Sequence, residues 1–116
     1  MRSLTRPSQE NSKRTSSQQP AQQRQLVVVV VGASSGIGHA TAVAFAKRGA
    51  KLVLAARSAD TLAPVVMECL AEGGSALGIP TDVTDSAAVE KLAQRTVSHY
   101  GRIDVWVNAA GVGAVG

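Results

Sequence analysis

The sequence has very few aromatic residues and almost no cysteine. Its 116 residues include one Trp, one Tyr, one Phe and a single cysteine, Cys69. One cysteine excludes an internal disulfide, a zinc site built from cysteines and a CxxC redox pair, and we expect Cys69 to be a buried structural thiol. No stretch reaches the roughly 18 apolar residues of a membrane helix. We therefore expect a cytoplasmic protein with no membrane partner and no metal.

The excess positive charge lies at the start of the chain. Lys and Arg number 12 against 8 Asp and Glu, and residues 1–25 hold five of the basic residues but one of the acidic ones. These residues are rich in Ser and Gln, so they bury too little apolar surface to offset the entropy of ordering them. They also lack the apolar stretch of a secretory signal. We predict a disordered basic tail that is dispensable for the fold, in preference to a nucleic-acid or membrane arm.

From Leu26 onward, short apolar runs alternate with segments at helical spacing. Parallel strands that are covered on both faces have continuous apolar runs. Buried strands are predicted over 26–31, 51–56, 75–80 and 103–107. Helices are predicted over 37–48, 61–71 and 86–100. This alternation is typical of an α/β protein with a Rossmann-like, doubly wound parallel sheet, and residues 26–116 are predicted to be the N-terminal part of such a domain.

Two helices are predicted in more detail from single residues. The first helix places Ile37, Ala40, Ala44 and Phe45 on one apolar side. Pro64 lacks the N–H that a helix interior needs, so we begin the second helix late enough to place this proline in the first turn.

Glycines gather where the first strand must turn into the first helix. The stretch "GASSGIG" covers residues 32–38. At such a corner, free backbone N–H groups and the helix dipole can meet a phosphate, provided that no side chain stands in the way. We assign the tight turn to Gly32, the approach of a pyrophosphate to Gly36 and close helix packing to Gly38. The hydroxyls of Ser34 and Ser35 can bond phosphate or cap the helix.

Two other phosphate loops do not fit these residues, and a turn without a ligand remains the alternative. A mononucleotide P-loop needs a lysine after its last glycine, but His39 follows Gly38. The usual dinucleotide spacing GxGxxG is replaced by GxxxGxG. We interpret His39 as a helix-surface residue, because no acidic partner is evident beside it.

The end of the second predicted strand bears on the choice of dinucleotide. Folds that use NAD place an acidic residue there to hold the ribose 2′-hydroxyl. This sequence has Ala56 and Arg57 instead. A guanidinium can pair bidentately with a 2′-phosphate, so we expect NADP rather than NAD, with Arg57 binding it. A solvated arginine is the alternative.

Three motifs stand in order along the chain: "GASSGIG" (32–38), "TDVTD" (81–85) and "DVWVNAAGV" (104–112). Together they resemble the motifs of the short-chain dehydrogenases/reductases over nearly all of residues 26–116. To the residues of the glycine motif named above, the resemblance adds Ile37 as a cofactor-binding residue. It also implies that Asp82 and Val83 contact the adenine and that Asn108, Ala109 and Gly111 line the cofactor cleft.

Two residues depart from the pattern of that family. Val31 stands where the family usually has a threonine whose hydroxyl helps to fix the loop, and Ala109 replaces the second asparagine of the third motif. Neither change removes a backbone contact to phosphate.

The same resemblance implies that the catalytic residues follow the third motif. They would be a serine and a tyrosine with a lysine four residues later. The chain ends at Gly116, so we assign no catalytic residue. The single tyrosine, Tyr100, is followed four residues later by Asp104 and precedes the fourth strand, at the amino end of the sheet. We expect a fragment that is inactive alone, with the fourth strand as an unpaired apolar edge.

The resemblance implies hydride transfer between a nicotinamide cofactor and a small-molecule alcohol, ketone or aldehyde, in a full-length protein that forms homo-oligomers. Two other functions stay open. A non-catalytic dinucleotide-binding or sensing module would have the same sequence up to Gly116, and a methyltransferase can use the same fold. A downstream serine followed by YxxxK would favour the oxidoreductase.

Overall fold

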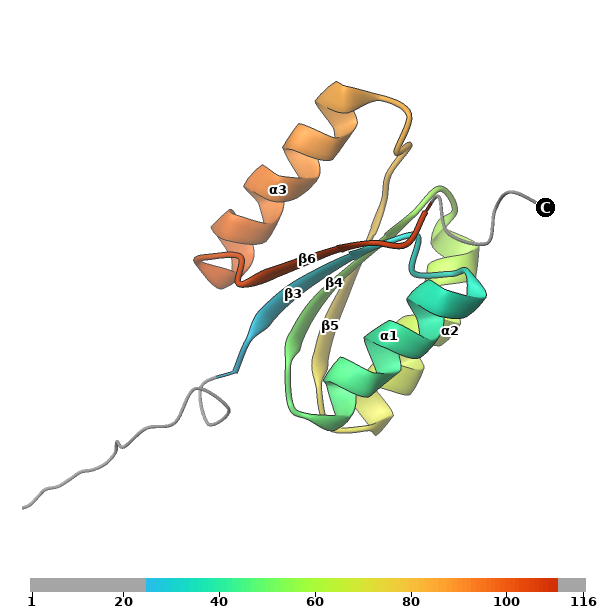
Figure 1. The fold of residues 1–116 in the computed structure, drawn as a ribbon, viewed down its shortest axis with the longest axis vertical. Coiled ribbons are helices and arrows are strands. Elements are labelled where there is room, and N and C mark those ends of the chain that lie inside the picture. Colours follow the sequence, from blue (N-terminus) through green and yellow to red (C-terminus); the bar gives the residue numbers. More distant parts are fainter. Residues whose placement is uncertain (1–24, 111–116) are drawn as a thin grey trace, which may run out of the picture.

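Four parallel strands form one sheet within residues 25–110, which are the residues that the computed structural model describes. The elements are β3 (Val27–Val31), α1 (Gly36–Lys47), β4 (Lys51–Ala56), α2 (Ala59–Ala71), β5 (Ser75–Pro80), α3 (Ser86–Tyr100) and β6 (Val105–Asn108). The sheet order is β5-β4-β3-β6, so the chain runs outward from β3 to β5 and then crosses to the other side of β3 (Figure 1). This is the Rossmann-like alternation that the sequence predicts. None of the described helices is long and apolar enough to cross a membrane.

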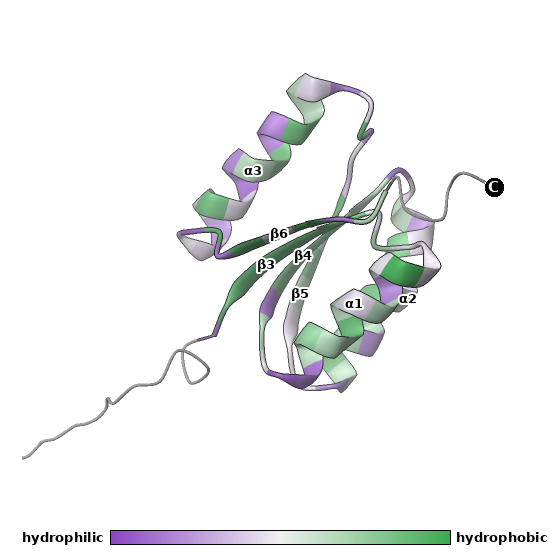
Figure 2. Cartoon of the chain, viewed as in Figure 1, coloured by the Kyte–Doolittle hydropathy of each residue, from purple (hydrophilic) through white to green (hydrophobic). Residues whose placement is uncertain are grey.

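Helices cover both faces of the sheet, with α1 and α2 on one face and α3 on the other (Figure 1). Val28 and Val30 pack in the core with α1 and α2, whereas Val29 and Val31 pack with Leu92 of α3. All five valines of β3 are buried, because neither face of this strand meets water. Figure 2 shows β3 as hydrophobic along its length, while α3 alternates hydrophobic and hydrophilic residues. Each fully buried valine contributes about 1.5 to 3 kcal/mol.

Helix α1 buries a different side from the one that its larger apolar residues suggest. Its buried residues are Gly38, Ala42 and Ala46. Small side chains on this side let the helix approach the strands closely, whereas Ile37 is 50% exposed. The apolar side predicted from the sequence is therefore not the buried one. It comprises Ile37, Ala40, Ala44 and Phe45, of which only Phe45 packs at the margin of the core.

Helix α2 begins at Ala59 rather than at Thr61, which places Pro64 inside the helix. The cap is Ser58, whose Oγ accepts a hydrogen bond from the Asp60 N–H at 3.1 Å. Pro64 therefore lies in the second turn and not in the predicted first turn. The missing proline N–H leaves one helical hydrogen bond unmade. The cap at Ser58 and the added first turn outweigh that loss. Helix α3 has its predicted bounds.

The outer strands are less buried than predicted. Strand β5 is partly buried along most of its length, and β6 alternates between partly buried and exposed residues. Among the described residues, both strands are edges of the sheet. Full burial on both faces therefore holds for β3 and β4 only, and Trp106 of β6 is 37% exposed.

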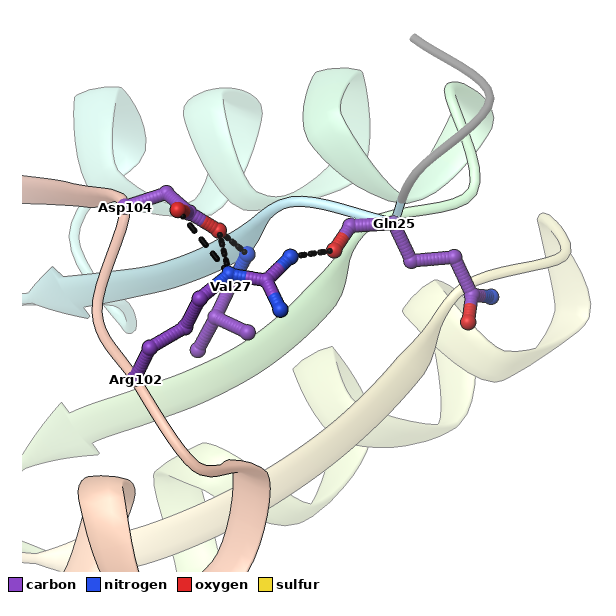
Figure 3. Close-up of polar contacts among 4 residues, drawn as sticks. All are labelled: Gln25, Val27, Arg102 and Asp104. Atoms are coloured by element: carbon purple, nitrogen blue, oxygen red, sulfur yellow. Dashed lines mark hydrogen bonds and ion pairs between the residues drawn. The ribbon is translucent and has the colours of Figure 1, made fainter. Parts of the chain in front are cut away.

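A side-chain clamp ties the amino ends of β3 and β6 together (Figure 3). Asp104 Oδ2 accepts a hydrogen bond from the N–H of the buried Val27 at 2.8 Å. Arg102 Nε donates to both carboxylate oxygens of Asp104, at 3.0 and 2.9 Å. Its Nη2 donates to the Gln25 carbonyl at 2.9 Å. The clamp holds the two segments together just before the first paired residues of β3 and β6, Val28 and Val105. It includes Gln25, which the sequence places in the predicted tail.

We expect Asp104→Ala to destabilise the fold. The substitution leaves the buried Val27 N–H without the carboxylate, and a buried unsatisfied donor costs about 1 to 3 kcal/mol. Urea denaturation should show a free energy of unfolding that is lower by this amount. Asp104→Asn keeps an acceptor oxygen and should lose clearly less. Equal stability of the alanine variant and the parent protein would contradict the role of the clamp.

Candidate functional site

The corner after β3 is closed by the segment that follows β6. Gly32 has a φ of +84°, a conformation that glycine adopts at little cost. Its N–H donates to the Ala55 carbonyl at 2.8 Å. A Cβ on Gly32 would lie 2.6 Å from the backbone nitrogen of Ala110. Glycine is therefore required here both for the turn and for the close approach of the distant chain.

The start of α1 is held tightly against this turn. A Cβ on Gly38 would lie 2.0 Å from the Gly32 carbonyl oxygen. The hydroxyl of Ser35 donates to that same carbonyl oxygen at 2.8 Å and accepts from the Gly38 N–H at 3.2 Å. Ser35 is the N-cap of the helix, whereas Ser34 is exposed. The Ser35 hydroxyl is thus hydrogen-bonded within the protein, whereas Ser34 is exposed to solvent.

Gly36 contrasts with its two neighbours in the motif, because it faces open space. Within residues 25–110, no atom outside its own turn of the chain lies within 4 Å of the position that its Cβ would take. The N–H groups of Gly36 and Ile37 have no acceptor among residues 25–110, as is usual in the first turn of a helix. Free N–H groups at the positive end of a helix dipole, with no side chain in front of them, can bind an anion such as phosphate.

The end of β6 is hydrogen-bonded to the end of β3. The Ala109 N–H donates to the Val31 carbonyl at 2.8 Å, and Ala109 is buried. Asn108 Oδ1 accepts from the Ala110 N–H at 3.3 Å. A hollow of about 360 Å³ lies at this end of the sheet, lined by Val31, Val83, Val89, Trp106, Asn108 and Ala110. Its walls are mostly apolar.

Arg57 and Asp82 meet beyond the ends of β4 and β5. Arg57 Nη2 lies 3.7 Å from Asp82 Oδ1, and the two side chains are 76% and 52% exposed. The same Oδ1 accepts hydrogen bonds from the hydroxyl and the N–H of Thr84, at 2.6 and 3.0 Å. These bonds from Thr84, with a smaller effect of the Arg57 charge, hold the pKa of the Asp82 carboxyl below its ordinary value.

The residues predicted for the cofactor lie at the carboxyl ends of the strands. In parallel sheets of this kind, ligands bind there, beside the point where the strand order reverses. That point lies between β3 and β6, where Gly32 meets Ala110 and where the hollow beside Val83 opens. Arg57 and Asp82 lie further along the same edge, after β4 and β5. The predicted Gly111 lies outside the described residues.

Two side-chain contacts were not predicted from the sequence. His39 Nε2 lies 2.7 Å from Glu68 Oε1 on α2, so the statement that His39 has no acidic partner was wrong. Nothing in the local sequence indicates this pair, because it depends on how α1 and α2 pack together. The Thr84 contacts of Asp82 could have been predicted, since Asp and Thr two residues apart commonly form such a turn.

Tyr100 lies at the opposite end of the sheet. Its hydroxyl is 3.3 Å from Ser75 Oγ, and Lys51 Nζ lies 5.8 Å from its ring centroid. Ser75 and Lys51 are the first residues of β5 and β4. Tyr100 is therefore at the amino end of the sheet, as predicted, whereas the glycine corner lies at the carboxyl end.

The remaining candidates for chemistry within residues 25–110 are few. Cys69 is buried, as predicted, and burial is the main reason that the pKa of its thiol is raised. A raised pKa disfavours the reactive thiolate. No three His, Cys, Asp or Glu side chains of the described part of the chain come together in a way that could hold a metal ion.

Comparisons with known proteins agree on one family. Residues 26–116 match the sequence model described as short chain dehydrogenase. An uncharacterized oxidoreductase of Listeria innocua is 46% identical over 79 residues, which are 67% of this chain and 32% of the relative.

Solved structures are similar over the same part of the chain. An alcohol dehydrogenase from the archaeon Thermococcus sibiricus, complexed with 5-hydroxy-NADP, has a TM-score of 0.68 and 34% identity, over 72% of this chain and 36% of its own. An NADH-dependent reductase complexed with NAD has a TM-score of 0.66 and 29% identity, over 72% and 35%. The chain thus spans about a third of the length of these relatives.

Proposed function

The chain belongs to the short-chain dehydrogenase family of oxidoreductases, and from this premise we propose that residues 26–116 are the NADP(H)-binding part of such an enzyme. The full-length protein would transfer hydride between the nicotinamide cofactor and a small-molecule alcohol, ketone or aldehyde. Its location would be the cytoplasm, and its assembly state a homo-oligomer.

The observation that carries this proposal is the open corner at Gly36. Gly32 and Gly38 are each packed against backbone, whereas among residues 25–110 no other part of the chain lies in front of Gly36, and the N–H groups of Gly36 and Ile37 have no acceptor there. A pyrophosphate supplies the negative charge that this helix start favours. The apolar hollow beside Val83 and Asn108 is suited to the adenine. The other predicted cofactor residues, Ser34, Ile37, Ala109 and Gly111, belong to the same proposal.

The proposal of NADP rests on Arg57. The side chain is 76% exposed beyond the end of β4, and no acidic residue stands at this position to hold a 2′-hydroxyl. A guanidinium is suited to a phosphate because it offers paired N–H donors as well as charge. The structural relatives include a complex with an NADP derivative and one with NAD, so a comparison of the two cofactors tests the role of Arg57.

The experiment is a titration of the full-length protein with NADPH and with NADH. We expect NADPH to bind about tenfold to a hundredfold more tightly, since a charge-assisted hydrogen bond to a phosphate contributes about 1.5 to 3 kcal/mol. Fluorescence of the reduced nicotinamide reports both dissociation constants. Equal or tighter binding of NADH would overturn the NADP proposal, and binding of neither dinucleotide would overturn the proposed function.

The alternative is a non-catalytic dinucleotide-binding or sensing module, and turnover separates the two. We expect the full-length protein to oxidise NADPH with some member of a panel of ketones and aldehydes. The 116-residue chain alone should show no turnover, because Tyr100 lies at the amino end of the sheet beside Ser75 and Lys51. Cofactor-dependent turnover by the isolated chain would contradict this assignment, and a full-length protein that binds NADPH without any turnover would favour the sensing module.

The sequence predicts that residues 1–25 are dispensable for the fold, and we propose a boundary one residue earlier, with residues 1–24 dispensable. One contact refines the boundary. Because Arg102 donates to the Gln25 carbonyl, a truncated protein should keep Gln25 and remove residues 1–24 only.

A further inference from the structure

Arg57 and Asp82, two residues of the proposed cofactor site, form an ion pair beyond the ends of β4 and β5. The distance of 3.7 Å between Arg57 Nη2 and Asp82 Oδ1 is too long for a hydrogen bond. The attraction between the two groups is therefore electrostatic. Since both side chains are more than half exposed, the pair is weak.

The two partners are held to very different degrees. Asp82 Oδ1 accepts two hydrogen bonds from Thr84, at 2.6 and 3.0 Å, so the carboxylate is fixed within its own turn. The Arg57 guanidinium makes no hydrogen bond among residues 25–110. Arg57 can therefore turn toward a ligand while Asp82 keeps its contacts, and the carboxylate stays beside the site in either case.

We propose that Asp82 sets how strongly the site prefers a dinucleotide with a 2′-phosphate, by neutralising the charge of Arg57. A ribose phosphate carries a charge of about −1.5 to −2 at neutral pH. It meets an Arg57–Asp82 pair with no net charge, rather than an unopposed guanidinium. This inference rests on the proposed function, and it makes Asp82 a positioning and specificity residue in addition to its proposed contact with the adenine.

The test compares NADPH and NADH on the full-length Asp82→Asn variant. Both dinucleotides carry the same adenine, so any change in the adenine contact affects the two dissociation constants alike and cancels in their ratio. The substituted side chain keeps an amide oxygen that can accept from Thr84. We expect the preference for NADPH over NADH to rise about twofold to fivefold, which is the size of effect that an exposed ion pair can have.

A matched control removes the same charge from the same turn. Asp85 Oδ1 accepts from the Ala87 N–H at 3.0 Å as the N-cap of α3, and asparagine serves equally well as a cap. Asp85→Asn should leave the ratio of the two dissociation constants unchanged. If it raised the ratio as much as Asp82→Asn does, the effect would come from the general charge of the turn and the proposal would fall.

Repeating Asp82→Asn in an Arg57→Ala background tests whether Asp82 acts through Arg57. The rise in the ratio should shrink to less than half in that background. An undiminished rise would show that Asp82 acts directly on the phosphate, and an unchanged or lower ratio in the single variant would also overturn the inference. These outcomes differ from a failure of the proposed function, in which the parent protein would bind neither dinucleotide and both proposals would fall.

Discussion

Replacing Gly38 by alanine should destabilise the protein strongly and abolish dinucleotide binding. The new Cβ would lie 2.0 Å from the carbonyl oxygen and 2.7 Å from the carbonyl carbon of Gly32, and neither atom belongs to a flexible side chain. Helix α1 would have to move away from the turn, which breaks the hydrogen bond from the Ser35 hydroxyl to the Gly32 carbonyl. Overpacking costs about 1 to 3 kcal/mol and sometimes more. We expect a loss of about 3 kcal/mol or more in the free energy of unfolding, measured in urea.

Gly36→Ala is the matched control, with the same chemical change two residues earlier. In the part of the chain that the structure describes, no atom outside the same turn lies within 4 Å of the new Cβ, so the free energy of unfolding should stay within about 1 kcal/mol of the parent value. In the proposed site the methyl group would instead meet the pyrophosphate, and NADPH should bind about tenfold more weakly or worse. Unchanged NADPH affinity in Gly36→Ala would contradict a phosphate site at this corner. A fully stable Gly38→Ala variant would contradict the packing described for α1.

Replacing Arg57 by alanine should weaken NADPH binding about tenfold to a hundredfold, through loss of a charge-assisted contact worth about 1.5 to 3 kcal/mol. Binding of NADH should change by less than about twofold, because NADH has no 2′-phosphate for Arg57 to contact. Since the side chain is 76% exposed and packs against little, the thermal unfolding of the variant should match that of the parent protein.

The control for this substitution is Arg95→Ala, which removes the same charge from an exposed position on α3. It should leave both dissociation constants unchanged. A similar loss of NADPH affinity in Arg95→Ala would mean that the net charge of the surface, and not a contact at the end of β4, attracts the phosphate. Equal losses for NADPH and NADH in Arg57→Ala would place Arg57 elsewhere on the dinucleotide.

Local chemistry explains which elements were predictable from the sequence. The strands β4 and β5 and the helix α3 have their predicted bounds, because continuous apolar runs, a capping Asp85 and a terminal Gly101 act within a few residues. Gly101 has a φ of +91°, which is the conformation that stops a helix. For these three elements, the signal is local and the predicted bounds agree with the structure.

Packing between distant elements explains what was not predictable. The apolar side predicted for α1 is not its buried side, because the small side chains of Ala42 and Ala46 fit the short distance between helix and sheet. The size of Ile37 and Phe45 gives no information on that distance. The pair of His39 and Glu68 depends on how two helices lie together. In the candidate site, the glycine motif and Arg57 were found from residue types alone, whereas the ion pair with Asp82 needed the strand order.

The contact of Gly32 with Ala110 also bears on the order in which the molecule assembles. Strand β3 is synthesised before β4, β5 and β6, but the turn that follows β3 is packed against backbone that follows β6. A nascent chain that has been synthesised only as far as β5 has the glycine motif but lacks Ala109 and Ala110, which pack against Gly32. Contacts between segments so far apart form late, because a long loop must close before they contribute. A dinucleotide that binds at this corner would therefore act on folding after β6 has paired, by slowing the reopening of a finished sheet rather than by guiding its formation.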